Sequence, residues 1–368
     1  MSEALYRKYR PRKLKDIVGQ GHVKQYLANA VKNDKLSHAY LFVGPRGTGK
    51  TTLARILAMI INCDNGPSLD YDINSKVCKS IIEESCLDVR EMDAGDKSSV
   101  EDIRNIKKLA GTYPVICRKR VFIIDECHRL SGAASTALLK TLEEPPETSV
   151  FILATTEPQK ILETIQSRCQ KFNLRNISEE EIVKHLIFVA KSEGVKKGNK
   201  EAFFKIARYA RGSMRDALSG LESVIEHGDG EVMPETVSDL LGSCFNHLSF
   251  SNLIDSIASL DYKESINIVK KELKSGTDPS SLFMDILNFS HDMLLSKTLQ
   301  TSGFIVMEKE NKEEWDSIVD KYSLDVFLLI HKNIMKYANI SLETVRSDIS
   351  METCVIDTIS KLSCLKNN

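Results

Sequence analysis

The stretch Gly44-Pro-Arg-Gly-Thr-Gly-Lys-Thr51 decides the fold of this 368-residue chain. It fits the pattern G-x-x-x-x-G-K-[ST] of a phosphate-binding loop. Its glycines allow backbone angles that side chains forbid, so consecutive amides can turn toward one anion. The pattern predicts that Lys50 reaches the β- and γ-phosphates of a nucleotide and that the Thr51 hydroxyl holds a magnesium ion.

The segments on either side of the loop support this interpretation. Residues 38–43 form a short apolar run, which predicts a buried parallel strand. Residues 52–61 have apolar side chains at helical spacing, so the phosphates would lie at a helix N-terminus. A chance glycine-rich turn would not explain the strand before the loop and the helix after it.

Bulk properties limit the function classes. The length suggests two or three domains, and the net charge of −1 argues against a general polyanion binder. Nucleic-acid contact would therefore come from local patches or from an assembly. Nine cysteines without a regular framework and no apolar N-terminal segment predict the reducing cytoplasm. No apolar run approaches the roughly 20 residues that span a bilayer.

A second half of the nucleotide site follows the apolar run before Asp125 and Glu126. Such a run predicts a buried strand whose C-terminal end carries both carboxylates to the phosphate loop. Asp125 would bind magnesium, and Glu126 would polarise the attacking water. Paired acids are weak evidence alone, but after a phosphate loop they are strong. Further strands are expected at residues 87–92, 149–154 and 170–174, and helices at 22–33, 100–109 and 133–144.

Three more side chains are candidates for the site. Thr155 follows a predicted strand, where its hydroxyl either senses the γ-phosphate or caps the strand. Arg168 lies past the last site element, so it either completes a neighbouring subunit's site or is a surface charge. Arg215 falls in the first turn of a helix that begins near Gly212. A cation is unfavourable there, and a bound phosphate would offset that cost.

Two segments remain ambiguous from their residues alone. Residues 4–20 are basic with Tyr6 and Tyr9 interleaved, and they could be a nucleic-acid arm, a cover over a nucleotide base or a solvated tail. Composition favours the tail. Residues 63–78 are loop-like, and two cysteines fifteen positions apart do not make a four-ligand zinc site, even if Asp72 or Cys86 were recruited. Structural thiols are the favoured interpretation.

The rest of the chain is predicted to be helical. Ser178 and Glu181 form a capping box that opens a helix, and roughly three short helical pieces reach about Leu241. Residues 242–368 are again helical, with breaks near 276–279 and 301–303. They carry no chemical motif. Their apolar stripes are typical of a core or a subunit interface; examples are Phe283, Ile286, Leu287 and Phe289.

Together these motifs resemble the gamma/tau subunits of the bacterial DNA polymerase III clamp loader, which are AAA+ ATPases. The matching segments are YRKYRP, GPRGTGKT, Asp93-Ala94, IIDECHRL, LLKTLEEPP, FILATTEPQKI, SRCQKF and GSMRDALS, between residue 4 and about residue 225. The order LLKTLEEPP, FILATTEP, SRC is specific to this family. The resemblance implies an α/β AAA+ domain with a parallel sheet at 1–177, a small helical lid domain at 178–241 and an all-α collar or oligomerisation domain at 242–368.

The resemblance also implies residue roles. Lys50 and Thr51 bind phosphate and magnesium, Asp125 and Glu126 are metal ligand and catalytic base, and Thr155 and Arg215 resemble the sensor 1 and sensor 2 residues. Arg168 resembles a finger supplied to the next subunit's ATP, worth ~10³–10⁵ in rate. The adenine-wrapping segment would comprise Tyr6, Arg7, Tyr9, Arg10, Pro11, Val18, Gly19 and Gln20. The loop set would be Gly44, Pro45, Arg46, Gly47, Thr48, Gly49, Lys50, Thr51 and Thr52.

The chain departs from the family pattern in two places. The four positions of the family's zinc module, in an insertion at about 63–86, are Cys63, Asp72, Ser75 and Cys78. Two thiolates are missing, so we expect the shape to persist and zinc binding at Cys63 and Cys78 to be weak or absent. The chain ends at residue 368, where a tau-type extension would begin, so the resemblance does not extend to gripping the polymerase and the helicase.

The implied function is mechanical. ATP binding would hold an assembly of this subunit, its copies and delta- and delta-prime-type subunits that opens the sliding clamp on primed DNA, and hydrolysis would release the clamp. The polymerase active site of the holoenzyme would lie in another chain. Three alternatives stay open: a helicase, suggested by Asp125-Glu-Cys-His128; another DNA-acting AAA+ ATPase of recombination or replication restart; and a non-hydrolysing scaffold, which predicts a broken phosphate loop.

Overall fold

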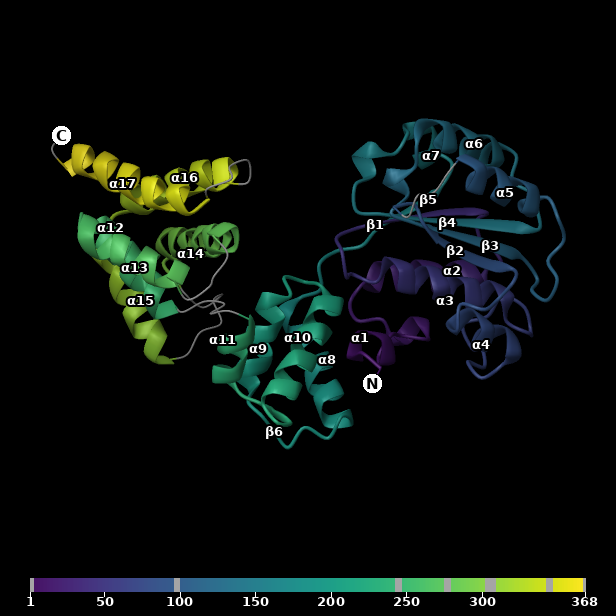
Figure 1. The fold of residues 1–368 in the computed structure, drawn as a ribbon, viewed down its shortest axis with the longest axis horizontal. Coiled ribbons are helices and arrows are strands. Elements are labelled where there is room, and N and C mark those ends of the chain that lie inside the picture. The colour runs from purple at the N-terminus through teal and green to yellow at the C-terminus, as the bar shows by residue number, and fades with distance from the viewer. Residues whose placement is uncertain are drawn as a thin grey trace. The chain divides into compact units, whose positions relative to one another are not determined.

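The computed structural model describes residues 3–95, 100–241, 247–274, 279–301, 309–341 and 347–366. The chain forms two compact units, residues 1–236 and 237–368 (Figure 1). The first unit contains every segment with a chemical motif. A three-domain division at 1–177, 178–241 and 242–368 stays a prediction.

A parallel five-stranded sheet forms the centre of the first unit, with the strand order β2-β3-β4-β1-β5. The strands are β1 Ala39–Val43, β2 Val89–Asp93, β3 Arg120–Asp125, β4 Ser149–Thr155 and β5 Gln170–Asn173. Every residue of β1 and β4 is buried, as expected for central strands covered on both faces. The predicted parallel sheet is therefore confirmed, and the carboxyl ends of β1, β3 and β4 meet at one edge.

Helices cover both faces of this sheet (Figure 1). One face carries α2 Gly21–Lys32, α3 Lys50–Asn62 and α4 Lys76–Ile82. The other carries α5 Val100–Ala110, α6 Gly132–Glu143 and α7 Glu163–Gln166. Successive strand residues alternate between the two cores. Ile123 packs with the first group of helices, whereas Phe122 and Ile124 pack with the second.

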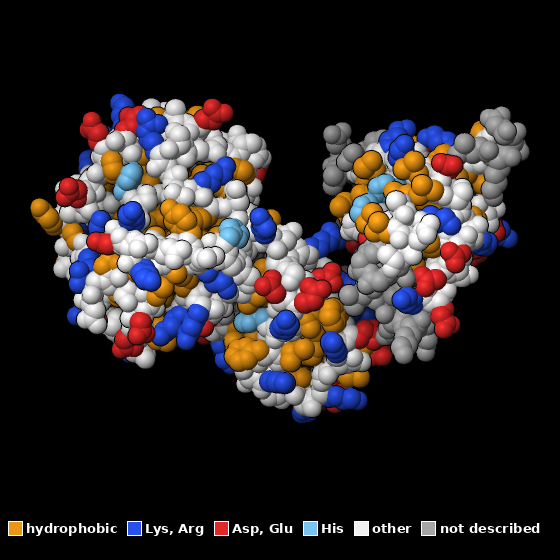
Figure 2. All heavy atoms as spheres, turned by 180° about the vertical axis from the view of Figure 1, so that it is seen from behind, with side chains coloured by type: hydrophobic (Ala, Val, Ile, Leu, Met, Phe, Trp, Pro, Cys, Tyr) orange, Lys and Arg blue, Asp and Glu red, His pale blue; other side chains and the backbone are white. Residues whose placement is uncertain are grey.

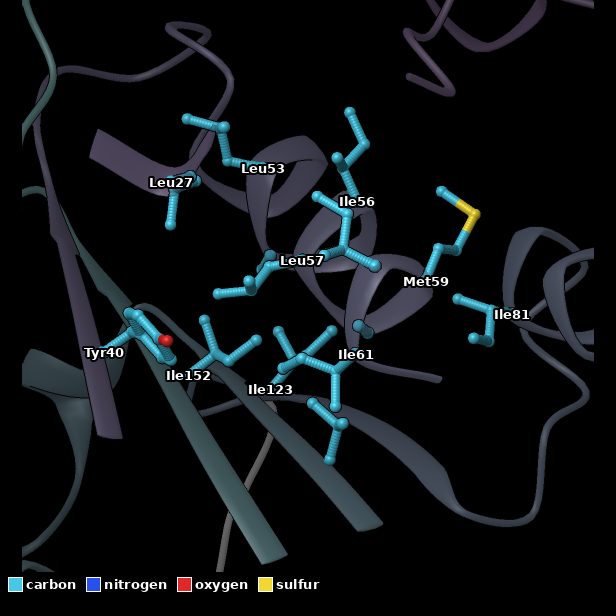
Figure 3. Close-up of a cluster of buried hydrophobic side chains, with 14 of the residues drawn as sticks. Leu27, Tyr40, Leu53, Ile56, Leu57, Met59, Ile61, Ile81, Ile123 and Ile152 are labelled. Atoms are coloured by element: carbon cyan, nitrogen blue, oxygen red, sulfur yellow. The ribbon is translucent and has the colours of Figure 1, made fainter. Parts of the chain in front are cut away.

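Helix α3 is the most deeply buried helix of the first face. Figure 3 shows its side chains above Ile123 of β3 and Ile152 of β4, with Leu27 and Tyr40 at one end and Ile81 at the other. Ten of its thirteen residues are buried. Each fully buried aliphatic side chain contributes about 1.5–3 kcal/mol, so the helix that follows the phosphate loop is firmly fixed to the sheet.

The N-terminal segment is ordered, so the solvated tail favoured by composition is wrong. Helix α1 Leu5–Lys8 and the short turn η1 Leu14–Asp16 precede α2. Leu5 is buried and its N–H lies 3.3 Å from Glu222 Oε1, while Lys8 pairs with Glu193 at 2.7 Å. Composition missed this order because three apolar residues within the basic stretch, Leu5, Leu14 and Ile17, are buried.

The segment after β5 contains four helices: α8 Glu179–Ser192, α9 Lys200–Tyr209, α10 Met214–His227 and α11 Pro234–Leu241. Two two-residue strands, β6 Lys197–Gly198 and β7 Glu231–Val232, pair in parallel. The prediction of roughly three helical pieces and no strand in this segment is therefore wrong. The strands were missed because two residues are too few to show a periodicity. Ser178 does cap α8, since its Oγ accepts the Glu181 N–H.

The second unit is wholly helical in its described residues. Its helices are α12 His247–Ala258, α13 Tyr262–Lys274, α14 Pro279–Leu299, α15 Lys309–Lys321, α16 Leu324–Ser341 and α17 Ser347–Lys366. Phe283, Ile286 and Phe289 are buried there as predicted, and Leu287 packs beside them. Of the predicted breaks near 276–279 and 301–303, residues 276–278 and 302–303 lie outside the described residues, and α14 begins at Pro279 and ends at Leu299. Among the helices described, none is both long and apolar enough to cross a membrane.

Candidate nucleotide-binding site

The phosphate loop connects β1 to α3 and depends on its glycines. Gly47 and Gly49 have φ values of +74° and +99°, which side chains rarely adopt. A Cβ on Gly47 would also lie 1.8 Å from Ser213 Oγ, at the beginning of α10. The Gly47 carbonyl accepts the Met214 N–H at 3.1 Å, so the loop directly contacts the helix that carries Arg215.

Lys50 and Thr51 begin α3 and turn toward the sheet edge. Lys50 is buried, and its Nζ donates to the carbonyls of Gly44 and Pro45 at 2.9 Å each. Burial lowers the pKa of Lys50, while the carboxylates of Glu126 and Asp125 act in the opposite direction. The Thr51 hydroxyl donates to Asp125 Oδ2. The two side chains predicted to hold magnesium therefore meet at one point.

Glu126 follows β3 in a strained conformation. Its φ is +46°, in the left-handed region that non-glycine residues seldom occupy, and such strain costs about 1–3 kcal/mol. Its carboxylate accepts the Thr156 hydroxyl at 3.2 Å and lies 3.3 Å from His128 Nδ1. The Glu126 carboxylate therefore contacts both Thr156, directly after β4, and His128.

These groups surround a cavity of about 750 Å³, within the range of small-molecule sites. The N-terminal segment and α10 close its other sides. The Arg215 guanidinium lies 5.0 Å from the centre of the Tyr6 ring. Of the predicted site residues, the cavity wall includes Tyr6, Tyr9, Arg10, Pro11, Val18, Arg46, Gly47, Thr48, Gly49, Lys50, Thr51, Thr52, Asp125, Glu126 and Arg215.

Four other predicted site residues are not part of the cavity wall: Gly19, Gln20, Gly44 and Pro45. Their contacts stabilise the segments that form the wall. Gly44 donates its N–H to the Thr155 carbonyl at 3.1 Å, and Pro45 accepts from Lys50. Gln20 joins the N-terminal segment to the end of the sheet, since its side chain bonds the N–H and the carbonyl of Arg175. Gly19 precedes it with a φ of +66°.

Arg7, Thr155 and Arg168 do not line this cavity. Arg7 lines a smaller adjoining cavity of about 450 Å³. Thr155 is fully buried, with its Oγ1 accepting the Glu157 N–H and lying 3.0 Å from His128 Nδ1. Arg168 is about one-third exposed and bonds Glu143 at 2.9 Å and the Thr164 carbonyl at 2.8 Å.

Several wall residues had no assigned role in the sequence analysis. They are Ile17, Asp93, His128, Arg129, Thr156, Glu157, Ile177, His185, Met214 and Leu218. All of these except Ile17, Ile177 and His185 stand inside quoted motifs, whereas those three gave no local signal. His185 comes from α8, and burial lowers its pKa. Sequence distance explains the omission of His185, because α8 reaches the cavity only through the fold.

Residues at the predicted zinc positions make hydrogen bonds with neighbouring residues of the same segment. Cys63 Sγ donates to the Ile60 carbonyl at 3.3 Å, Ser75 caps α4, and Asp72 accepts the Asn74 N–H. Burial raises the pKa of the Cys63 and Cys78 thiols. Across the part of the chain that is described, no group of three or more His, Cys, Asp or Glu side chains is arranged to hold a metal.

Comparisons with known proteins identify the family. Three family models match: DNA polymerase III, delta subunit, over residues 19–178; the ATPase lid domain of the DNA polymerase III clamp loader subunit over 181–230; and domain III of DNA polymerase III subunits gamma and tau over 232–355. The DNA polymerase III subunit gamma of Buchnera aphidicola (from Acyrthosiphon pisum) is 38% identical over 319 residues, which cover 87% of each chain. The chain belongs to the gamma/tau family of DNA polymerase III subunits.

Other gamma/tau relatives are longer. The tau subunit of Bacillus subtilis is 41% identical over 80% of this chain, yet the match covers 52% of that relative. The chain thus spans about half the length of that tau subunit. Among solved structures, the branch-migration motor RuvB of Thermotoga maritima is 21% identical with a TM-score of 0.47, covering 68% of this chain and 79% of that one. That score is too low to support an assignment.

Family membership confirms the resemblance drawn from the motifs and the AAA+ fold class. A parallel sheet, a lid and a helical domain follow one another along the chain. The roles of individual residues are not decided by the family match.

Proposed function

We propose that this gamma/tau-family chain is an ATP-driven motor subunit of the clamp loader, which opens the sliding clamp and loads it on primed DNA during replication. The observation that carries the proposal is the meeting of Lys50, Thr51, Asp125 and Glu126 around one cavity. This arrangement contains every group that phosphoryl transfer to water requires within one subunit.

The residues fit ATP and magnesium. Nothing lies within 4 Å of where a Cβ on Gly49 would stand, which leaves room for a phosphate against the loop, and the joined oxygens of Thr51 and Asp125 are ligands that magnesium prefers. Bound magnesium would neutralise charge on the β- and γ-phosphates. Lys50 would exchange its carbonyl partners for phosphate oxygens. Glu126 would accept a proton from the attacking water, and Arg215 would approach the phosphates from α10.

The N-terminal segment is the proposed base-binding wall. Tyr6, Tyr9, Pro11 and Val18 contribute ring and aliphatic surface to the cavity. Tyr9 also donates a hydrogen bond to Glu193 near the end of α8, so the same segment that would contact adenine also contacts the lid. Nucleotide binding can therefore alter the position of the lid, which is how we propose that ATP controls assembly.

The partners we propose are delta- and delta-prime-type subunits, further copies of this chain, the sliding clamp and primed DNA. The relatives of this chain in Bacillus subtilis and Buchnera aphidicola are subunits of DNA polymerase III. On the face in Figure 2, basic and acidic side chains are interspersed over the described residues, in keeping with the net charge of −1. DNA contact through an assembled inner surface, rather than through one subunit alone, suits this distribution.

One alternative remains: another DNA-acting AAA+ ATPase of recombination or replication restart. It would share the ATP site but not the clamp. A non-hydrolysing scaffold is less well supported, because the phosphate loop and both acids are intact.

The test uses the chain assembled with its partner subunits, clamp and primed DNA. Glu126→Gln should keep ATP binding and lower phosphate release by about 10²–10⁴-fold, because it removes the base. Lys50→Ala should lose both ATP binding and phosphate release. Lys32→Ala, at the exposed end of α2, is the matched control. Normal hydrolysis by Lys50→Ala would refute the ATP site. Hydrolysis without clamp loading would favour the alternative ATPase.

A further inference from the structure

His128 bridges the proposed catalytic base and the end of β4. It lies in the short turn η2 Cys127–Arg129, and its side chain is only 9% exposed. Its Nδ1 lies 3.3 Å from Glu126 Oε2 and 3.0 Å from Thr155 Oγ1, while its Nε2 lies 3.2 Å from Glu157 Oε1. The imidazole ring therefore contacts both Glu126 and the segment 155–157 at the end of β4.

We propose that His128 is a positioning residue for Glu126. It holds the carboxylate of the base at the cavity by linking it to residues 155–157 at the end of β4. This inference rests on the proposed function, in which Glu126 accepts a proton from water. His128 itself does not touch the substrate in this role; it acts through Glu126.

Glu126 needs such support because few other contacts hold its side chain. Besides His128, its carboxylate contacts the Thr156 hydroxyl at 3.2 Å. A glutamate side chain loses up to about 2 kcal/mol of rotamer entropy when it is fixed. A base must stay within hydrogen-bond reach of its water, and a displacement of about 1 Å can cost 10²-fold in rate. The contact of Glu126 with His128 is therefore expected to affect the rate of hydrolysis directly.

The contacts around Thr155 fix the imidazole in turn. Thr155 Oγ1 accepts the Glu157 N–H at 2.9 Å and has a second lone pair, so an Nδ1–H of His128 can be shared between Thr155 Oγ1 and Glu126 Oε2. His128 Nδ1 is the neighbouring ring atom at 3.0 Å. A neutral imidazole has one N–H, so it can donate to Glu126 or to Glu157 but not to both at once. The ring therefore bonds Glu126 when the proton is on Nδ1 and Glu157 when the proton is on Nε2, without changing its position.

Two substitutions separate the two ring nitrogens. An asparagine amide reaches approximately the position of Nδ1, and a glutamine amide approximately that of Nε2. His128→Asn should therefore keep the contact with Glu126, and His128→Gln should keep only the contact with Glu157. His22→Ala is the control, because His22 is exposed and its ring contacts the Asn173 carbonyl.

The experiment measures kcat, KM for ATP and nucleotide affinity in the complete assembly. His128→Ala should lower kcat by about 10–100-fold with KM and affinity changed less than about threefold. His128→Asn should recover much of that loss, and His128→Gln should not. The melting temperature of each variant is measured beside its rate.

The outcomes distinguish the inference from the proposed function. If Glu126→Gln is inactive while His128→Ala turns over within twofold of the parent, the positioning role is wrong and the proposed function stands. If kcat, nucleotide affinity and melting temperature of His128→Ala all fall together and His128→Asn restores none of them, His128 has only a structural role. Normal hydrolysis by Glu126→Gln would refute the base assignment first.

Discussion

At the scale of single residues, Thr155, which ends β4, and Thr156, which follows it, have different environments. Thr156 lines the cavity and donates to Glu126, whereas Thr155 is buried against His128 and Glu157. Thr156→Val should lower kcat about tenfold, the cost of one hydrogen bond of about 1.4 kcal/mol, and leave the melting temperature unchanged. Thr155→Val should instead lower stability by about 1–3 kcal/mol, because buried partners lose their hydroxyl.

The serine variants provide the control, since they keep the hydroxyl and lose only a methyl group. Thr156→Ser should turn over nearly normally. Steady-state hydrolysis and thermal unfolding, measured on all four variants, decide the matter. A larger rate loss in Thr155→Val than in Thr156→Val, at equal stability, would return the phosphate-sensing role to Thr155.

This pair shows where sequence reasoning about the site stops. Lys50, Thr51 and Asp125 could be predicted because the chemistry fixes their spacing within one loop and one strand end. Two neighbouring threonines at a strand end point to opposite sides, and only the packing of the sheet decides which one faces the cavity. His185 could not be predicted at all, since α8 brings it to the cavity from outside the motif region.

At the scale of elements, one buried carboxylate organises the turn before β3. Asp88 is fully buried and accepts the N–H groups of Val115, Ile116 and Cys117 at 2.7–3.0 Å, with Arg120 at 3.5 Å. Burial acts to raise the pKa of Asp88, but the backbone donors and Arg120 outweigh it and lower that pKa below its usual value. The turn keeps its shape although Tyr113, Val115 and Ile116 are exposed.

Asp88→Asn should therefore lower the free energy of unfolding by about 2 kcal/mol near neutral pH, because an amide NH₂ cannot accept these hydrogen bonds. The pKa of Asp88 is lower in the folded state, so its contribution is complete above the unfolded value of about 4 and is lost as the pH falls through the folded value. The difference between parent and variant should therefore shrink as the pH falls below about 4. Urea unfolding at pH 7 and pH 3, with exposed Asp70→Asn as control, tests this; a pH-independent difference would contradict it.

Elements with long apolar runs were predictable, and short or tertiary ones were not. The runs in β1, β3 and β4 identify central strands, because only a sheet covered on both faces tolerates them. The strands β6 and β7 have two residues each and are held by neighbouring helices. Likewise, α1 is ordered by contacts with Glu222 and Glu193 rather than by its own four residues.

At the scale of the whole molecule, every group of the proposed ATP site lies in the first unit, apart from any group supplied by a neighbour. Arg168 is the candidate for such a group. It faces away from the cavity of its own chain and is held at the surface by Glu143. An exposed ion pair of this kind is worth about 0–1 kcal/mol, so the guanidinium can leave Glu143 at little cost when a phosphate is presented.

If Arg168 completes the site of an adjacent copy, two inactive chains should complement each other. Arg168→Ala keeps an intact ATP site but supplies no guanidinium, whereas Lys50→Ala supplies the guanidinium but lacks the site. Each alone should hydrolyse ATP slowly in the assembly, with Arg168→Ala reduced by about 10³-fold or more. A mixture should recover a fraction of the parent rate, because some interfaces combine one intact half from each chain. Arg104→Ala, an exposed arginine on α5, is the control and should turn over normally. The idea is wrong if the mixture does not recover activity and the isolated Arg168→Ala chain binds ATP more weakly. Arg168 would then act within its own subunit, and hydrolysis would have no physical reason to depend on assembly.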